Sequence, residues 1–410
     1  MIKKLVSEAL DKNLGSAVKL LEILIKFPSV RGHEKEIGLF LKPIFEKLAD
    51  TAELVEIPDS LQDDPDYSFR LANFSYAGAA NLRVALLGTG QGRKLAFNTH
   101  LDVVPPAPGQ ADPFTARASG GNIYGRGACD AKGQIAVLWL VLNTLRDLGQ
   151  KPGGDVIIDF VVEEECGGNG TLHVVRNGLA ADGAVVLEPT DLQVVHLVRG
   201  AVWFEIVAKG KAGHSGSPES AVSAIKNAVK AMEAVEQIRE EILRVSRSAI
   251  PKLANHPNPM PCTFGMLHSG NWPASAPSEA VVKGVFGFLP PFKRKDVQDK
   301  LAGALQPHSA DVKFNMLRSD PSYVAEDHPL VLAMVEAAKE SGIYSRPAFM
   351  NASCDSWRYV EQLGIPAVVF GPGSIATAHS EEEHIAVDDI KSAALALILL
   401  IHAWSGLNHE

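Results

Sequence analysis

The stretch Val156-Ile157-Ile158-Asp159-Phe160-Val161-Val162 leads directly into Glu163-Glu164-Glu165 and, one residue later, into Gly167-Gly168. A run of mostly β-branched apolar residues bounded by glycines predicts a buried strand. The three glutamates then leave the carboxyl end of that strand, where open α/β sheets bind their ligands. Carboxylates gathered there repel one another and are costly to desolvate unless a cation, a shared proton or a basic side chain compensates them. A solvated acidic turn is the alternative explanation of this triplet.

Further candidate ligands follow other predicted strands or a glycine-rich turn, and they are His100, Asp102, Asp130, Glu188 and His379. The apolar runs 94–97, 183–187 and 367–370 predict three more strands, each followed by at least one of these residues. Asp130 lies instead in the glycine-rich segment 125–133, ahead of a helical pattern. Imidazole nitrogens together with carboxylate oxygens suit zinc, cobalt or manganese, whereas calcium prefers oxygen alone. The pattern predicts a metal site.

Composition and charge restrict the class of protein. The chain has 410 residues, which exceeds what one hydrophobic core normally supports and predicts two domains. Its formal net charge of -9 disfavours nucleic acid as a partner, because a polyanion gains nothing from an acidic surface. Four cysteines without paired spacing fit a reducing compartment better than a disulfide framework. Residues 1–26 predict an amphipathic helix that is neither a signal peptide nor a membrane span, so we expect a cytoplasmic protein with no membrane partner.

The order of predicted elements places the chain in the α/β class, with a mostly parallel sheet flanked by helices in the catalytic domain. From about Gly200 the predicted elements follow the order strand, helix, strand, strand, helix, strand, which is the order of a ferredoxin-like sandwich. His379 comes after this block while the other candidate ligands precede it, so the block is predicted to be an insertion. We therefore expect catalytic residues 1–198 and 319–410 around an inserted lid or dimerisation domain of residues 199–318.

Several of these stretches together resemble the M20 family of metallopeptidases and deacylases, which includes acetylornithine deacetylase, succinyl-diaminopimelate desuccinylase and related dipeptidases. The resemblance covers nearly the whole chain. It is carried by His100-Leu101-Asp102-Val103-Val104-Pro105, Ile123 to Gly133, Glu163 to Gly168, Leu187-Glu188-Pro189-Thr190 and Ala378-His379-Ser380. It implies a zinc-exopeptidase-like catalytic domain and a hydrolase of amide or peptide bonds.

The resemblance also implies how the candidate ligands divide between two ions. A pair of divalent ions, zinc by default with cobalt or manganese as alternatives, would be bridged by Asp130. His100 and Glu188 would hold one ion, and Glu165 and His379 the other.

Two further acidic residues would support these ions. By the same resemblance, Asp102 would hydrogen-bond the His100 ring and fix its tautomer. Glu164 would be the general base, taking a proton from the attacking water and passing it to the departing amine. In a shifted register Glu163 would be the base and Glu164 a ligand. The distance to Gly167-Gly168 favours the first register.

Two basic residues are candidates for contact with the substrate. His214 lies in a glycine-rich turn before a long helix. By resemblance it would enter the active site of the neighbouring subunit of a homodimer, formed through the inserted domain, and stabilise the oxyanion. A plain loop residue is the alternative. Arg358 resembles a residue near a substrate carboxylate, which an arginine can bind bidentately, and its alternative is a surface salt bridge on a helix.

The resemblance implies a metal-dependent amidohydrolase that removes an acyl group from an N-acyl amino acid or a related small amine, as acetylornithine deacetylase does. A dipeptidase or carboxypeptidase of the same family would use the same machinery. A catalytically inactive metal-binding protein is the alternative from another class. A serine or cysteine hydrolase is disfavoured because Ser215 lacks an elbow motif and the cysteines lack an evident catalytic neighbour.

Overall fold

The apolar run that precedes the three glutamates forms β7 (Val156–Val161), an interior strand of a nine-stranded mixed sheet. The computed structural model describes residues 2–253 and 256–409. Along the sheet the strands are β1 (Thr51–Glu56), β2 (Ala80–Leu86), β7, β3 (Leu95–His100), β8 (Gly183–Val186), β19 (Ala367–Val369), β9 (Val194–Val198) and β17 (Ser322–Tyr323), with β18 (Pro347–Met350) beside β9. The neighbours β7, β3, β8 and β19 run parallel, so their carboxyl ends meet at one edge. The predicted α/β class is confirmed.

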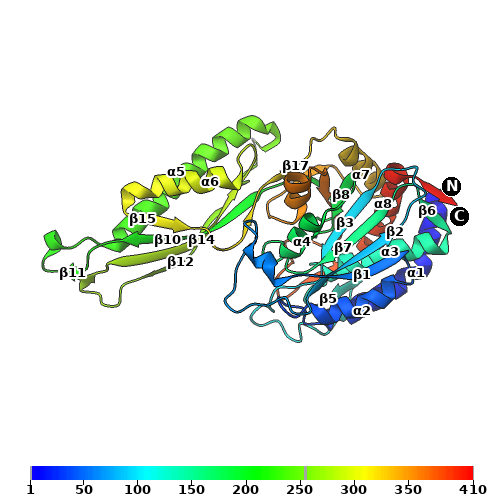
Figure 1. Ribbon diagram of the computed structural model, residues 1–410, viewed down its shortest axis with the longest axis horizontal. Coiled ribbons are helices and arrows are strands. Elements are labelled where there is room, and N and C mark those ends of the chain that lie inside the picture. The colour runs from blue at the N-terminus through cyan, green and yellow to red at the C-terminus, as the bar shows by residue number, and fades with distance from the viewer. Residues whose placement is uncertain (1, 254–255, 410) are drawn as a thin grey trace.

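Helices cover both faces of the large sheet (Figure 1). They are α1 (Ile2–Ile25), α2 (Lys35–Phe45), α3 (Lys132–Asp147), α4 (Asn169–Asn177), α7 (Pro329–Glu340), the π-helical segment η5 (Arg358–Leu363) and α8 (Val387–Ser405). Leu95 and Phe97 of β3 belong to the apolar cluster of α1, α3, α7 and α8, whereas Ala96 packs in a separate cluster with Tyr359 of η5. This alternation follows from the two-residue period of a strand. Within residues 2–253 and 256–409, no helix combines the length and the apolarity needed to cross a membrane.

A second lobe, which we call the lid, extends away from the large sheet (Figure 1). Its elements are β10 (Gly200–Lys209), α5 (Ala224–Ala249), β12 (Cys262–Ser269), β14 (Glu279–Phe288), α6 (Arg294–Leu305), β15 (Ala310–Lys313) and β16 (Arg318–Ser319). The antiparallel strands lie in the order β12-β14-β10-β15, with β16 also paired to β10, and this is the predicted ferredoxin-like arrangement. The lid has its own apolar core, which includes Phe204, Phe286 and Leu301. The exact domain limits at 198/199 and 318/319 remain our proposal.

Short strands complete the described chain. They are β4 (Arg117–Ser119), β5 (Asn122–Tyr124) and β20 (His384–Ala386) in one small sheet, β6 (Gln150–Pro152) with β21 (Leu407–His409), and β11 (Gly213–His214) with β13 (Ser275–Ala276). The β5–β20 pairing brings the segment after β19 next to the segment before α3. Residues that are far apart in the sequence therefore lie side by side at the edge of the large sheet.

Some helices differ from those that the sequence pattern predicts. The sequence pattern predicts a helix over 355–363, and the backbone is helical over 356–363, with η5 as its last six residues. The pattern also predicts a helix from Ser220, whereas α5 begins at Ala224. The nine-residue helix α4 was not predicted. It starts after Gly168, whose φ is 70°, instead of after the serine or aspartate cap that signals a helix start in a sequence.

The long segment between β1 and β2 connects the large lobe to the lid. The carboxylate of Asp66 accepts hydrogen bonds from Arg176 of α4 at 2.7 Å and from Gln362 of η5 at 2.8 Å. The same carboxylate also pairs with Arg294 of α6 in the lid. This segment therefore holds the lid against the edge of the sheet where the glutamate triplet lies.

Candidate metal centre and substrate cavity

Six of the predicted side chains meet at the carboxyl edge of the large sheet. They are His100 at the end of β3, Asp130 before α3, Glu164 and Glu165 after β7, Glu188 after β8, and His379 after β19. The strands that carry most of them are parallel neighbours, so the loops that follow these strands necessarily converge. The convergence predicted from the sequence is therefore present in the structure.

Asp130 lies between the two histidines. Its Oδ1 is 2.9 Å from Nε2 of His100, and its Oδ2 is 3.2 Å from Nε2 of His379. Glu165 Oε1 lies 2.9 Å from the same nitrogen of His379, and Glu188 Oε2 lies 3.9 Å from Nε2 of His100. One carboxylate with an oxygen toward each of two imidazoles is the arrangement that a bridging ligand requires.

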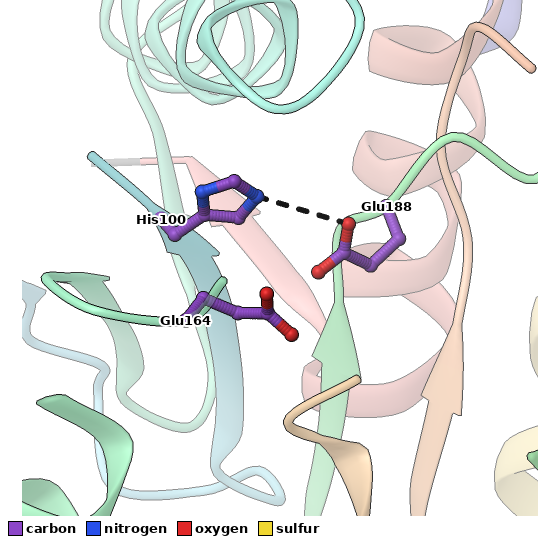
Figure 2. Close-up of side chains that lie close together, drawn as sticks. All are labelled: His100, Glu164 and Glu188. Atoms are coloured by element: carbon purple, nitrogen blue, oxygen red, sulfur yellow. Dashed lines mark ion pairs between the residues drawn. The ribbon is translucent and has the colours of Figure 1, made fainter. Parts of the chain in front are cut away.

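The donor atoms fit divalent cations. Ligand atoms of His100, Glu164 and Glu188 lie within 4.8 Å of one another (Figure 2), and those of His100, Asp130 and Glu165 form a second such group. Oε1 of Glu188 is buried and has no hydrogen-bond partner among the described residues. A buried carboxylate oxygen without a partner is costly, and a cation would compensate it. The mixture of nitrogen and oxygen donors suits zinc, cobalt or manganese.

Three glutamates of this centre, Glu164, Glu165 and Glu188, retain protons more strongly than exposed carboxylates do. The pKa of Asp130 is lowered instead, because its hydrogen bonds with His100 and His379 outweigh its burial. Burial, followed by the nearby charge of Glu188, raises the pKa of Glu164 well above its usual range. Burial also raises the pKa of Glu188 and of Glu165, and repulsion from Asp130 adds to both shifts. Hydrogen bonds with Asp130 and Glu165 raise the pKa of His379 to about 10. Divalent ions that bind here would displace protons.

Asp102 orients the centre in two ways. Nδ1 of His100 lies 2.9 Å from the backbone carbonyl of Asp102 and 3.5 Å from its Oδ1. If Nδ1–H donates to this carbonyl, the lone pair of Nε2 points toward Asp130 and Glu188. The carboxylate of Asp102 accepts the backbone N–H groups of Glu164 and Glu165, each at 3.1 Å. Asp102 thus contacts the His100 ring as expected, most closely through its backbone carbonyl, with its carboxylate farther away.

Glu163 points away from the centre. Its buried carboxylate pairs with Arg31, accepts the hydroxyl of Tyr76 and accepts Nδ2 of Asn169 at 2.9 Å. These contacts occupy Glu163, so the shifted register, with Glu163 as the base, does not fit the geometry. Glu164 and Glu165, by contrast, both face the centre and line the adjoining cavity.

A cavity of about 400 Å³ separates the centre from the base of the lid. Its lining includes Glu164, Glu165, Arg199, Trp203, Trp357 and His379. Arg199 donates to the backbone carbonyls of Asn351 at 3.0 Å and Gly200 at 3.4 Å. Among the described residues no carboxylate forms an ion pair with it, and burial lowers the pKa of Arg199 to about 10. The cavity therefore combines one cationic group with aromatic walls.

The structure does not bring the two predicted substrate contacts to this cavity. His214 lies in β11 at the far tip of the lid (Figure 1), where it is exposed and its Nδ1 accepts the N–H of Gly216 at 3.0 Å. Arg358 is fully buried in η5 and donates to the carbonyl of Gly167 at 2.8 Å, so it is neither a cavity residue nor a surface residue. The cation that does line the cavity, Arg199, was not predicted. It precedes Gly200 at the start of the lid, but no local sequence signal marks it as a cavity residue.

A centre of this composition, open on one side to a cavity, places the protein in the class of metal-dependent hydrolases of amide or peptide bonds. The sequence profile of Peptidase family M20/M25/M40 matches residues 96–403, and the chain belongs to this family. The resemblance found in the sequence motifs is thereby confirmed.

Relatives within the family differ in the reaction that their names describe. Acetylornithine deacetylase of Myxococcus xanthus is 27% identical over 345 residues, which cover 80% of this chain and 84% of that protein. An Aspergillus oryzae protein named "Probable carboxypeptidase" is 25% identical over 410 residues, with 93% and 85% covered. The crystal structure of aminopeptidase PepT from Bacillus cereus has the same fold, with a TM-score of 0.75, 20% identity, and 95% of this chain and 98% of that chain covered.

Proposed function

We propose that the protein is a dinuclear amidohydrolase that removes an acyl group from an N-acyl amino acid. The single observation that carries the choice of a substrate with a free carboxylate is Arg199, a cation without an acidic partner in a cavity that also contains Glu164. The 27% identity to acetylornithine deacetylase of Myxococcus xanthus favours an acyl group on the other side of the amide. A free α-carboxylate is the group that a partly buried guanidinium binds most strongly. Trp203 and Trp357 on the cavity wall suit an apolar part of the same substrate.

The proposed mechanism assigns one task to each group of residues. One divalent ion would be held by His100 and Glu188, and the other by Glu165 and His379. Asp130 would bind both ions. When bound, the ions polarise the amide carbonyl and acidify the attacking water.

Glu164 would move the proton in this reaction. Its carboxylate takes a proton from the attacking water and returns it to the amide nitrogen as the carbon–nitrogen bond breaks. Arg199 binds the carboxylate of the substrate and orients the amide toward Glu164.

One panel of substrates tests the proposal. Bound metal and hydrolysis are measured together for N-acetyl, N-formyl and N-succinyl amino acids and for dipeptides. We expect about two ions per chain and faster hydrolysis of N-acyl amino acids than of dipeptides. Preference for dipeptides would favour the second candidate, a peptidase, which the similarity to the Aspergillus oryzae protein supports. Bound metal without any hydrolysis would favour the non-catalytic alternative.

Arg199→Met is expected to weaken recognition of the carboxylate. Since a hydrogen bond to a charged group contributes about 1.5–3 kcal/mol, kcat/KM should fall roughly 10–150-fold, mainly through a higher KM. Steady-state kinetics on an N-acyl amino acid and on its C-terminal amide provide the comparison. The amide lacks the carboxylate, so the variant and the parent enzyme should process it equally. An equal loss on both substrates would contradict the assignment.

We further propose a homodimer that forms through the lid. Strand β12 is at the edge of the lid sheet, and its Met266 and Leu267 are 51% and 46% exposed. Ile225 and Val229, one helical turn apart on α5, are also exposed at 41% and 46%. Exposed apolar side chains beside an open strand edge favour association of two copies.

We also propose a reducing, cytoplasmic location, because the four cysteines are unpaired. The absence of nucleic-acid and membrane partners is part of the same proposal.

In such a dimer His214 would act on the active site of the partner subunit. We expect that mixing inactive Glu164→Ala subunits with inactive His214→Ala subunits restores activity, since one site of each mixed dimer has both groups intact. Activity is measured before and after subunit exchange, and exchange itself is followed with differently labelled subunits. Proven exchange without any recovery would exclude action between subunits.

A further inference from the structure

A buried ion pair, Arg126 with Glu383, lies behind the metal centre and has no part in the mechanism above. The two side chains are 1% and 0% exposed and are in direct contact. Taking two charges out of water costs several kcal/mol per ion, and apolar residues of similar volume often replace such a pair without loss of stability. A contribution to stability is therefore a weak explanation for this pair. Its other hydrogen bonds indicate a different role.

Each member of the pair contacts the backbone of a proposed metal ligand or of its neighbour. Oε1 of Glu383 accepts the N–H of Cys129 at 3.2 Å and the N–H of Asp130 at 3.3 Å. Arg126 donates from Nη2 to the carbonyl of His379 at 3.2 Å. The pair thus connects the loop of Asp130 with the loop of His379. These two loops come from the parts of the large lobe that precede and follow the lid in the sequence.

His379 needs such support more than the other ligands do. Its side chain is 50% exposed, whereas that of His100 is fully buried. Its φ of 62° lies in the left-handed region, which costs a residue with a side chain free energy unless its surroundings hold it there. Arg126 holds the carbonyl of this residue, and Glu383 in turn holds Arg126.

We propose that Arg126 and Glu383 form a positioning pair that sets the separation of Asp130 and His379 and thereby the affinity for the ion held by Glu165 and His379. The other ion depends less on the pair, because His100 and Glu188 lie on strand ends of the sheet. This inference rests on the proposed division of ligands between two ions. It concerns metal affinity and not the identity of the substrate.

The test compares two isosteric variants of buried ion pairs. Glu383→Gln keeps the shape of the side chain and removes the charge that faces Arg126. Asp159→Asn is the matched control, because Asp159 is 1% exposed and binds Arg83 at 2.7 and 3.1 Å in the same sheet, away from the metal centre. Zn²⁺ and Co²⁺ binding to the metal-free full-length proteins is measured by titration calorimetry, and Co²⁺ spectra report the ligand geometry.

For Glu383→Gln we expect the ion held by Glu165 and His379 to bind about 10–100-fold less tightly, as loss of an outer partner of a metal ligand typically causes. The affinity for the ion held by His100 and Glu188 should stay unchanged. Asp159→Asn should lower Tm and leave both affinities as in the parent protein. Unchanged affinities in both variants would overturn the proposal, and so would an equal loss for both ions. If Glu383→Gln does not fold, Glu383→Asp retains the charge at a shorter reach and should show a smaller loss confined to the same ion.

Calorimetry also separates this proposal from the proposed function. If the parent protein binds two ions but hydrolyses no N-acyl amino acid, the proposed function is wrong. The same titration of Glu383→Gln would still decide whether Arg126 and Glu383 position the metal ligands. A parent protein that binds a single ion would refute the pair, whatever the enzyme hydrolyses.

Discussion

Glu164→Gln should lower kcat by about 10²–10⁴-fold, the usual contribution of a general base, with bound metal and KM close to those of the parent enzyme. Glutamine has nearly the same shape as glutamate but cannot accept the proton of the attacking water. Glu164 suits this role because it lines the cavity and lies within 4.8 Å of ligand atoms of His100 and Glu188. Steady-state kinetics and metal analysis of the same preparation measure the effect.

The neighbouring Glu163 supplies the control for this prediction. Glu163→Gln should lower Tm, because it leaves the partly buried Arg31 without its carboxylate, while kcat falls far less than in Glu164→Gln. If Glu163→Gln abolished turnover at unchanged Tm and Glu164→Gln kept full turnover, the shifted register would be correct and the proposed mechanism wrong.

Asp130→Asn should lower metal affinity and kcat by more than the roughly 10–100-fold that loss of an outer partner of a metal ligand typically causes. The variant should bind no more than one ion per chain. The carboxylate faces His100 with one oxygen and His379 with the other, at 2.9 and 3.2 Å, so it is the one group placed to neutralise two cations at once. The asparagine amide has the same size as the carboxylate but carries no charge, and its NH₂ group is a poor metal ligand. Metal analysis after dialysis and kcat at saturating substrate measure both effects.

Chelation of the parent enzyme is the matching control for Asp130→Asn. Removal of metal should abolish activity, and added Zn²⁺, Co²⁺ or Mn²⁺ should restore it in the parent but not in the variant. Asp388→Asn, at an exposed residue in the first turn of α8 that belongs to neither group of candidate ligands, controls for loss of an acidic residue as such. Two bound ions and full turnover in Asp130→Asn would refute the bridging role.

The sequence pattern predicted much of the fold and the ligands of the centre. Residues 95–97 are buried and residues 156–162 are mostly buried, as expected of interior strands that helices cover on both faces. Polar residues directly after parallel strands must lie at the same edge, so the convergence of His100, Glu165 and Glu188 follows from local patterns alone. The ferredoxin-like order of the lid follows in the same way from alternating strand and helix periods.

Other features escaped prediction because their signals are not local. Helix α4 is short and starts at a glycine, so neither its length nor its cap is distinctive. Arg199 and Arg358 are both arginines near segment boundaries, and nothing in the neighbouring residues tells which one lines the cavity. Packing of η5 against α4 and Gly167 turns Arg358 inward, whereas the start of the lid leaves Arg199 at the cavity wall.

By itself the sequence determined the residue types that can bind metal, the strands that they follow and hence the edge at which they gather, because these depend on hydrophobic period and connectivity. Only the tertiary structure decided the direction of each side chain. It directs Glu163 toward Arg31 and Tyr76, leaves Glu164 facing the centre, and links Asp130 to His379 through Arg126 and Glu383. These choices depend on contacts between residues 87 to 257 positions apart in the sequence, and no local pattern encodes such contacts.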